Sequence, residues 1–215
     1  MKRFSISLLL VLGLSLTWTS AFAQMQKSAK DLDAEGKKRY GIESGRIKYE
    51  FSNEASGTEM VHFDRWGWLE MRDVSMENSL LGKAVAQRQQ VLLDGTQQIT
   101  HTKGSSYASA SMERHLSTAL QKASPAVEVL FGEAVIEAKN AKRAGRDEVM
   151  GKSCAVYEIP NESVKVWVWK GIVLKHEKRL FDKRVTMTAT MLDEEWKPEK
   201  KVFEMPEGLT GMPGE

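Results

Sequence analysis

The side chains most suited to acid–base or metal chemistry are scattered along this chain. Its four histidines stand at positions 62, 101, 115 and 176, and none has a histidine, cysteine or carboxylate at the short spacings that bind metal ions. His176 and Glu177 are adjacent on an expected strand, where neighbouring side chains point to opposite faces. The sequence therefore predicts neither a metal site nor a cofactor.

Motifs of nucleophilic and nucleotide chemistry are also missing from the sequence. The chain has no G-x-S-x-G elbow, no phosphate-binding glycine loop and no dinucleotide fingerprint. Its carboxylates are numerous but dispersed, so an acid–base pair brought together by the fold stays an open alternative. We expect a protein that is not an enzyme, and a hydrolase acting on envelope components is the least favoured interpretation.

The single cysteine limits how the core is held together. Because Cys154 is alone, no internal disulfide can form. It alternates with Val156 in an expected strand, which predicts a small buried side chain rather than a reactive thiol.

A two-faced hairpin is the richest apolar feature of the sequence. In Val164–Trp169, three valines alternate with Lys165, Trp167 and Trp169, which is the period of a strand. Lys170-Gly171 reads as a tight turn and Ile172–Glu177 as the return strand.

The register of this hairpin depends on its turn. A two-residue loop would place Trp169 opposite Ile172 and Trp167 opposite Leu174, but Lys170 is a poor residue for positive φ, so a bulge stays open. We expect the tryptophan face to point to the concave side of a sheet, and the valine face to be the outer surface.

The first 23 residues read as a secretory signal peptide. Lys2 and Arg3 precede the apolar run Phe4–Leu16, and Ala21-Phe22-Ala23 supplies a cleavage pattern before Gln24. The alternative is an uncleaved anchor, but the run is shorter than the roughly 20 residues of a membrane span. We therefore expect cleavage after Ala23, a periplasmic protein and no integral membrane segment.

The charge balance argues against a nucleic-acid partner. Without the two basic residues of the signal, 29 of the 31 basic residues remain against 29 acidic ones, so the net charge is near zero. A nucleic-acid-binding face would show as a clustered basic excess. The remainder is long enough for one domain with its own core.

Residues 24–45 form a polar lead-in, within which Ser28–Arg39 is either a short helix or an irregular segment. Residues 46–208 read as one domain of antiparallel strands, the last at Val202-Phe203, followed by a tail at 209–215. A helical insert over 111–142 interrupts the strands. Within it Pro125 opens an amphipathic helix that basic residues close near Ala141–Gly145.

Several stretches resemble a group of uncharacterised Gram-negative periplasmic proteins. They are Gly45–Tyr49, Phe63-Asp64, Glu148–Tyr157, Trp169–Lys175 and Phe203–Gly208. That group is similar in outline to the outer-membrane lipoprotein carriers LolA and LolB. The resemblance implies an α+β fold, with a strongly curved antiparallel sheet (an unclosed β-barrel) and helices covering its concave face. An acyl chain would then lie between sheet and helices.

We therefore expect a monomeric binding or carrier module for a lipid or other amphiphile, with a lipid or lipidated protein as partner. The alternative is a non-enzymatic cell-envelope interaction protein with a packed core and no ligand. The expected ligand-binding residues are apolar and come from the hairpin, the insert and the first strands: Trp167, Trp169, Ile172, Leu174, Phe131, Leu130, Tyr49, Phe51 and Phe63.

Overall fold

The computed structural model describes residues 27–78, 85–102, 105–110, 136, 140–180 and 182–204. The elements in these ranges are one short helix, three 3₁₀ turns and a series of strands. In chain order they are α2 (Ala29–Ala34), β1 (Gly45–Asn53), β2 (Ala55–Asp64), η1 (Arg65–Gly67), β3 (Leu69–Asn78), β4 (Val85–Asp94), β5 (Gln97–Thr102), β6 (Ser105–Ala110), β7 (Lys142–Val149), β8 (Lys152–Ile159), η2 (Pro160–Glu162), β9 (Val164–Trp169), β10 (Ile172–Leu180), β11 (Lys183–Asp193) and η3 (Lys200–Phe203).

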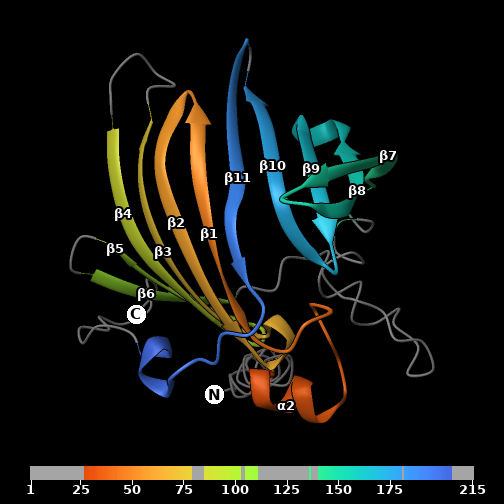
Figure 1. Ribbon diagram of the computed structural model, residues 1–215. Helices are drawn as coiled ribbons and strands as arrows, with labels where there is room; N and C mark the ends of the chain where they lie inside the picture. Colours follow the sequence, from red (N-terminus) through yellow and green to blue (C-terminus); the bar gives the residue numbers. More distant parts are fainter. Residues whose placement is uncertain are drawn as a thin grey trace, which may run out of the picture.

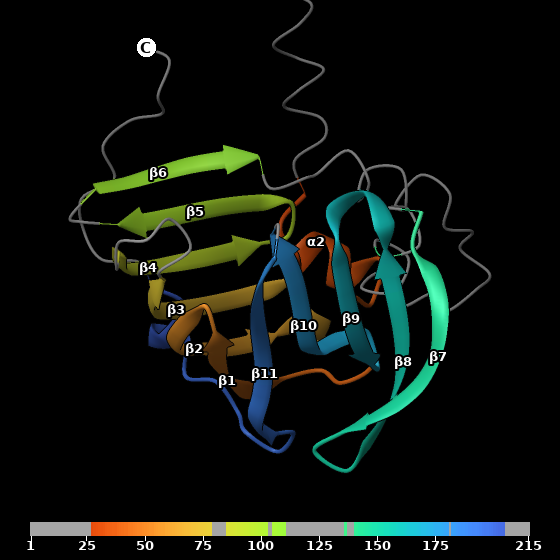
Figure 2. The ribbon, with the colours of Figure 1, turned by 90° about the horizontal axis from the view of Figure 1, so that it is seen from above.

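All the described strands belong to one antiparallel sheet. Its order is β6-β5-β4-β3-β2-β1-β11-β10-β9-β8-β7, so β6 and β7 are its two edges and the sheet does not close. Most neighbours in the sheet are also neighbours in the sequence, joined by short turns. Figures 1 and 2 show that the sheet bends strongly, with β1–β6 on one side and β7–β11 on the other. The expected curved antiparallel sheet is therefore confirmed.

Irregularities in strand pairing accompany the bend between the two sides. The register shifts between Lys48 and Tyr49 where β1 meets β11, and between Val173 and Lys175 where β10 meets β9. Such bulges locally bend a strand and increase its twist. The second bulge places Lys175, rather than Leu174, opposite Trp167. The expected Trp167–Leu174 pairing is therefore wrong, because Leu174 is itself the extra, unpaired residue of the bulge.

The turn of the tryptophan hairpin is the tight one. Lys170 and Gly171 have φ values of 47° and 75°, so both central residues are left-handed, as in a type I′ turn. Trp169 lies directly opposite Ile172, as expected for a two-residue loop. The Lys170 ammonium lies 4.5 Å from the centre of the Trp169 ring, so a cation–π contact accompanies the turn.

The N-terminal segment packs against one end of the sheet. Ser28 caps α2 and exchanges hydrogen bonds with Asp31, so the short helix predicted within Ser28–Arg39 is present. The Ala29 amide donates to Asp94 at 2.7 Å, and the Trp68 indole donates to the Lys37 carbonyl at 2.9 Å. These bonds hold the segment at the end of the strands where α2 is seen in Figure 1.

Both faces of the β9–β10 hairpin are buried. Trp167, Ile172 and Leu174 belong to a core cluster with Tyr49 and Phe63. The valine face, with Tyr157 and Ile159, forms a second cluster that includes Ile136 of the insert. The expectation that the valine face is an outer surface is therefore wrong, since apolar residues from the insert cover it.

The C-terminal boundary of the helical insert lies earlier in the chain than expected. Lys142–Gly145 belongs to β7, an edge strand whose side chains are exposed up to Glu148. An exposed edge strand shows no apolar alternation, and in sequence its cations resemble those that close a helix. Val202 and Phe203 likewise lie in the 3₁₀ turn η3 instead of a last strand. Leu130 and Phe131, and the helices expected over the concave face, lie outside the described residues.

Candidate functional site: a groove across β2 to β5

A groove with a volume of about 730 Å³ crosses the β2–β5 part of the sheet. Four adjacent strands contribute to it: Ser56, Gly57, Ser75, Met76, Glu77, Ala86, Arg88, Gln89, Gln90 and His101 line its walls. The strands pair in register here, with Ser75 opposite both Thr58 and Arg88, and Gln90 opposite His101. Ser75, Arg88, Gln90 and His101 are therefore brought side by side on one face, whereas Met76, one position after Ser75, points to the opposite face.

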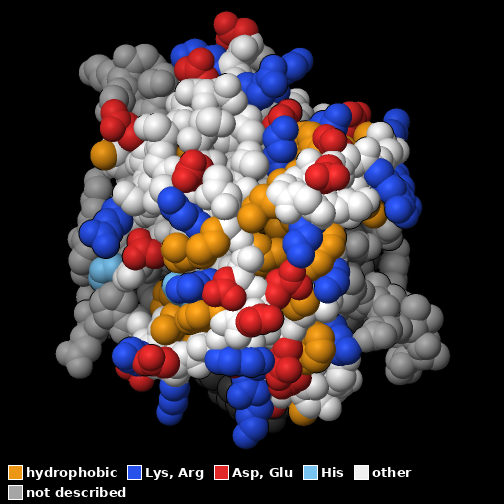
Figure 3. Space-filling view, in the orientation of Figure 1, with side chains coloured by type: hydrophobic (Ala, Val, Ile, Leu, Met, Phe, Trp, Pro, Cys, Tyr) orange, Lys and Arg blue, Asp and Glu red, His pale blue; other side chains and the backbone are white. Residues whose placement is uncertain are grey.

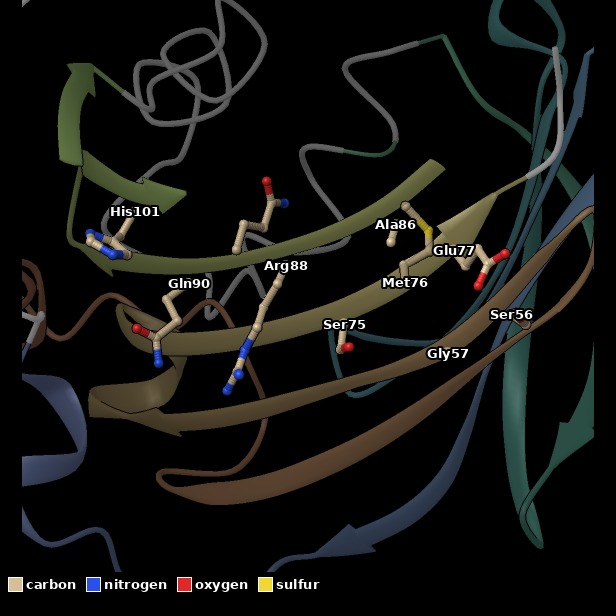
Figure 4. A pocket seen from close by; sticks show the side chains of 10 residues that line it. Ser56, Gly57, Ser75, Met76, Glu77, Ala86, Arg88, Gln90 and His101 are labelled. Carbon is tan, nitrogen blue, oxygen red and sulfur yellow. The ribbon is translucent and has the colours of Figure 1, made fainter. Parts of the chain in front are cut away.

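The two ends of the groove differ in chemistry (Figure 4). His101, Gln90 and Arg88 lie toward one end, and Met76, Ala86 and Glu77 toward the other, with Ser75 between them. The Arg88 side chain is 78% exposed, and its guanidinium is 3.9 Å from Asp73. Hydrogen-bond donors and a cation thus stand at one end, while the Ala86 methyl group and the Glu77 carboxylate stand near the other.

Gly57 allows β2 and β3 to approach closely beneath the groove. Its φ is +131°, and a Cβ atom there would lie 2.1 Å from the Ser75 carbonyl oxygen. Only glycine tolerates both the backbone conformation and the contact. The floor of the groove is therefore backbone rather than side chain at this point.

The opposite face of β3 carries a buried charge cluster. Glu70, which is fully buried, accepts hydrogen bonds from the Tyr40 hydroxyl and from Arg72, whose Nη2 lies 2.8 Å from Glu70 Oε2. Arg39 approaches Glu70 to 3.1 Å, and Arg72 also bonds Glu59 at 3.2 Å. Two arginines thus face two carboxylates. Because strand side chains alternate, this cluster anchors β3 beneath the groove.

Electrostatics keep Glu70 ionised despite its burial. Burial alone would raise the pKa of Glu70, but Arg39, Arg72 and the Tyr40 hydroxyl outweigh it and lower the pKa to about 2. Burial and the neighbouring carboxylate raise the pKa of Tyr40, against the opposing effect of Arg39. The cluster is therefore a fixed set of charges at neutral pH and not an acid–base pair poised for catalysis.

The aromatic residues expected to bind a ligand lie apart from the groove. Trp167, Ile172, Leu174, Tyr49 and Phe63 are all buried within one packed cluster, against which Trp169 also packs. Phe51 is only partly buried. The fold thus brings six of the nine expected residues together. Leu130 and Phe131 lie outside the described residues.

Lysines and a carboxylate surround the two hairpin indoles. Lys175 and Lys165 lie 4.3 and 5.4 Å from the centre of the Trp167 ring, and its indole nitrogen donates to Asp147 at 2.8 Å. Lys152 lies 4.7 Å from the Trp169 ring. These contacts fix the indoles in place. In Figure 3 hydrophobic side chains gather near the centre of the view and are interspersed with charges of both signs.

Within the described ranges, no three His, Cys, Asp or Glu side chains are grouped closely enough to hold a metal ion. No helix among the same residues has the length and apolar character needed to cross a membrane.

Sequence reasoning missed the groove and the charge cluster. The groove residues are small or polar and carry no motif. The cluster joins Arg39 and Tyr40 to β3 across about 30 positions. A usable signal in the sequence is the alternation of Glu70, Arg72 and Val74, which puts two charged residues on the face of β3 that a buried strand usually fills with apolar ones.

No family model and no curated protein matches the chain. Among solved structures, 84% of the chain aligns with 97% of LprF from Mycobacterium bovis, at 11% identity and a TM-score of 0.33. A second alignment joins 83% of the chain to 63% of MucB, at 12% identity and a TM-score of 0.36. At these scores neither similarity carries a functional assignment.

Proposed function

We propose that this protein is a non-enzymatic binding module for an amphiphile, and that the amphiphile binds in the groove across β2–β5. The observation that carries the proposal is the groove itself, about 730 Å³ in volume, with Arg88, Gln90 and His101 toward one end and Ala86 and Glu77 toward the other. Small-molecule sites typically measure about 300–1,000 Å³ and combine an apolar lining with a few polar groups.

The order of these groups matches an anionic or zwitterionic head group followed by an apolar chain. The Arg88 guanidinium forms only a long ion pair with Asp73, at 3.9 Å. It can therefore bind an incoming anion. Ala86, which lies on the same face as Arg88, offers an alkyl chain an apolar contact at the other end. A lipid, or the acyl part of a lipidated protein, has both parts.

The proposal includes a periplasmic location for the mature chain. Lys2-Arg3, the apolar run Phe4–Leu16 and the Ala21-Phe22-Ala23 site support export and cleavage. An exported module of this kind would meet amphiphiles of the cell envelope.

A second candidate function is an envelope interaction protein without a ligand. The observation in its favour is the packing of the hairpin, because Trp167, Ile172 and Leu174 are at most 4% exposed. Residues packed so tightly leave no room for an acyl chain between them.

Native mass spectrometry distinguishes the binding module from the interaction protein without a ligand. The sample is protein purified from the periplasm, and bound lipid is removed by organic extraction. The binding module should carry near-stoichiometric amphiphile, which extraction removes. Protein free of lipid that also fails to take up added lysophospholipid would favour the interaction protein and contradict the binding module.

A further inference from the structure

We propose that a second cleft, between the turn η2, β9 and the β10–β11 hairpin, binds a phosphate group through Arg179 and Arg184. The cleft has a volume of about 320 Å³, and Ser163, Lys165, Glu158 and Glu177 also contribute to its walls. It is separate from the groove across β2–β5, with which it shares no lining residue.

The two arginines face each other across the hairpin. Arg179 of β10 is directly opposite Arg184 of β11, and both side chains are exposed. Within the described part of the chain, no hydrogen bond or ion pair joins either guanidinium to another residue. Like charges at directly opposite positions destabilise a strand pair, so an anion between them would remove an unfavourable repulsion.

The carboxylates of the cleft are already paired with lysines. Glu177 lies 2.8 Å from Lys175, and Glu158 lies 3.5 Å from Lys165. Their charges are therefore largely offset, and the two guanidinium groups remain the uncompensated charges of the cleft. Figure 3 shows Lys and Arg side chains together with Asp and Glu side chains at the top of the molecule, where Figure 1 places the end of the β10–β11 hairpin.

The backbone at the rim adds polar groups beside the arginines. Ser163 adopts a left-handed conformation, with φ 53° and ψ 40°, at the end of η2. Its carbonyl accepts a hydrogen bond of 3.0 Å from the Arg179 amide, which ties the turn to β10. The turn thereby holds an exposed serine at the rim of the cleft next to Arg179.

Phosphate is the anion that this chemistry fits. A guanidinium presents its donors as a planar fork that matches two oxygens of a phosphate, and two forks can hold one tetrahedral group from two sides. The group can come from free phosphate or from the head group of a phospholipid, since both present the same oxygens.

Titration with inorganic phosphate at constant ionic strength, followed by thermal unfolding, tests the cleft. Phosphate should raise the melting temperature of the wild type. Arg179→Gln and Arg184→Gln should each weaken phosphate binding roughly tenfold, by loss of charge-assisted hydrogen bonds. The double variant should show no phosphate effect. Without phosphate it should be at least as stable as the wild type, because the cross-strand repulsion is gone.

Arg146→Gln is the matched control, because Arg146 is an exposed arginine on the edge strand β7. It should bind phosphate as the wild type does.

Sedimentation with phosphatidylglycerol and with phosphatidylcholine vesicles distinguishes a phospholipid head group from free phosphate as the source of the bound group. Loss of vesicle binding in the double variant identifies a lipid head group, and loss of free phosphate binding alone identifies a soluble ligand. A wild type that binds neither, or a double variant equal to Arg146→Gln, would overturn the proposal.

Discussion

At the residue scale, the most constrained side chain is Glu70 on β3. It is fully buried and is held between Arg39, Arg72 and the Tyr40 hydroxyl. Removing one partner of such a buried cluster leaves the other charges uncompensated. We therefore expect Glu70→Gln to lower the free energy of unfolding by about 3–5 kcal/mol at neutral pH, as measured by urea denaturation.

The same carboxylate gives the stability a pH dependence of known sign. Its pKa is lowered from 4.5 to about 2 in the folded protein, so the unfolded chain binds its proton first as the pH falls. The stabilisation is fully present above pH 4.5 and is lost as the pH falls toward 2. Glu70→Gln should make the free energy of unfolding less dependent on pH in this range.

Glu50→Gln serves as the control for Glu70→Gln. Glu50 is an exposed carboxylate of β1 that forms an ion pair with Lys48 at 3.1 Å. Surface changes of this kind usually alter stability by less than about 0.5 kcal/mol. Equal losses for the two variants would mean that the buried cluster has no special role.

Cys154 is buried, as its alternation with Val156 predicted. Its side chain is 0% exposed, its thiol donates to the Lys152 carbonyl at 3.3 Å, and burial raises the pKa of the thiol. Cys154→Ser should cost on the order of 1 kcal/mol or more, because a buried hydroxyl needs a stronger partner. A thiol reagent should label the native protein far more slowly than the urea-unfolded chain. Equal labelling rates would contradict the burial.

At the element scale, β3 is the strand that links the candidate site to the rest of the fold. One of its faces carries Glu70 and Arg72 of the charge cluster, and the other carries Ser75 and Glu77 of the groove. A change in the pairing of β3 with β2 would therefore shift the groove and the cluster together.

Gly57 tests that pairing. Gly57→Ala would place a methyl carbon 2.1 Å from the Ser75 carbonyl oxygen, in a residue with φ of +131°. We expect a loss of more than about 1 kcal/mol in the free energy of unfolding. Gly145→Ala is the matched control, because Gly145 has φ of +120° with nothing within 4 Å of the added carbon. The difference between the two variants measures the clash alone, and no difference would contradict the close approach.

The elements differ in how well sequence predicted them. The hairpin β9–β10 was predictable, because valines alternate with tryptophans and Lys170-Gly171 marks the turn. Its bulge at Leu174 was not, since one extra residue changes no local pattern. β6 gives little strand signal in the sequence, because all residues of Ser105–Ala110 except Tyr107 are serine or alanine.

At the scale of the whole molecule, the alternation of apolar and polar residues predicted the large antiparallel sheet. Most strands of this sheet pair with their neighbours in the sequence. The site was harder to foresee. Gathering Ser56, Ser75, Arg88 and His101 into one groove depends on the register of four strands, and their residue types alone give no sign of it. Aromatic residues suggested a binding surface, but most of them fill the core.

The mature chain should begin at Gln24, because the small residues at Ala21 and Ala23 fit a cleavage site. N-terminal sequencing of protein from a periplasmic fraction measures this directly. A chain that retains Met1 and stays with the membrane fraction would contradict both cleavage and the periplasmic location.

Titration of lysophospholipid into a variant with a filled groove tests whether an amphiphile binds across β2–β5. Ser75 is exposed and lies within the groove, so Ser75→Trp should occupy that space. Ser153→Trp is the matched control, since Ser153 is exposed on β8, away from the groove. Calorimetry should show lysophospholipid binding to the wild type and to Ser153→Trp. The affinity of Ser75→Trp should be at least tenfold lower, which corresponds to about 1.4 kcal/mol of binding free energy. Its melting temperature should be unchanged. Equal affinity for all three proteins would contradict the claim.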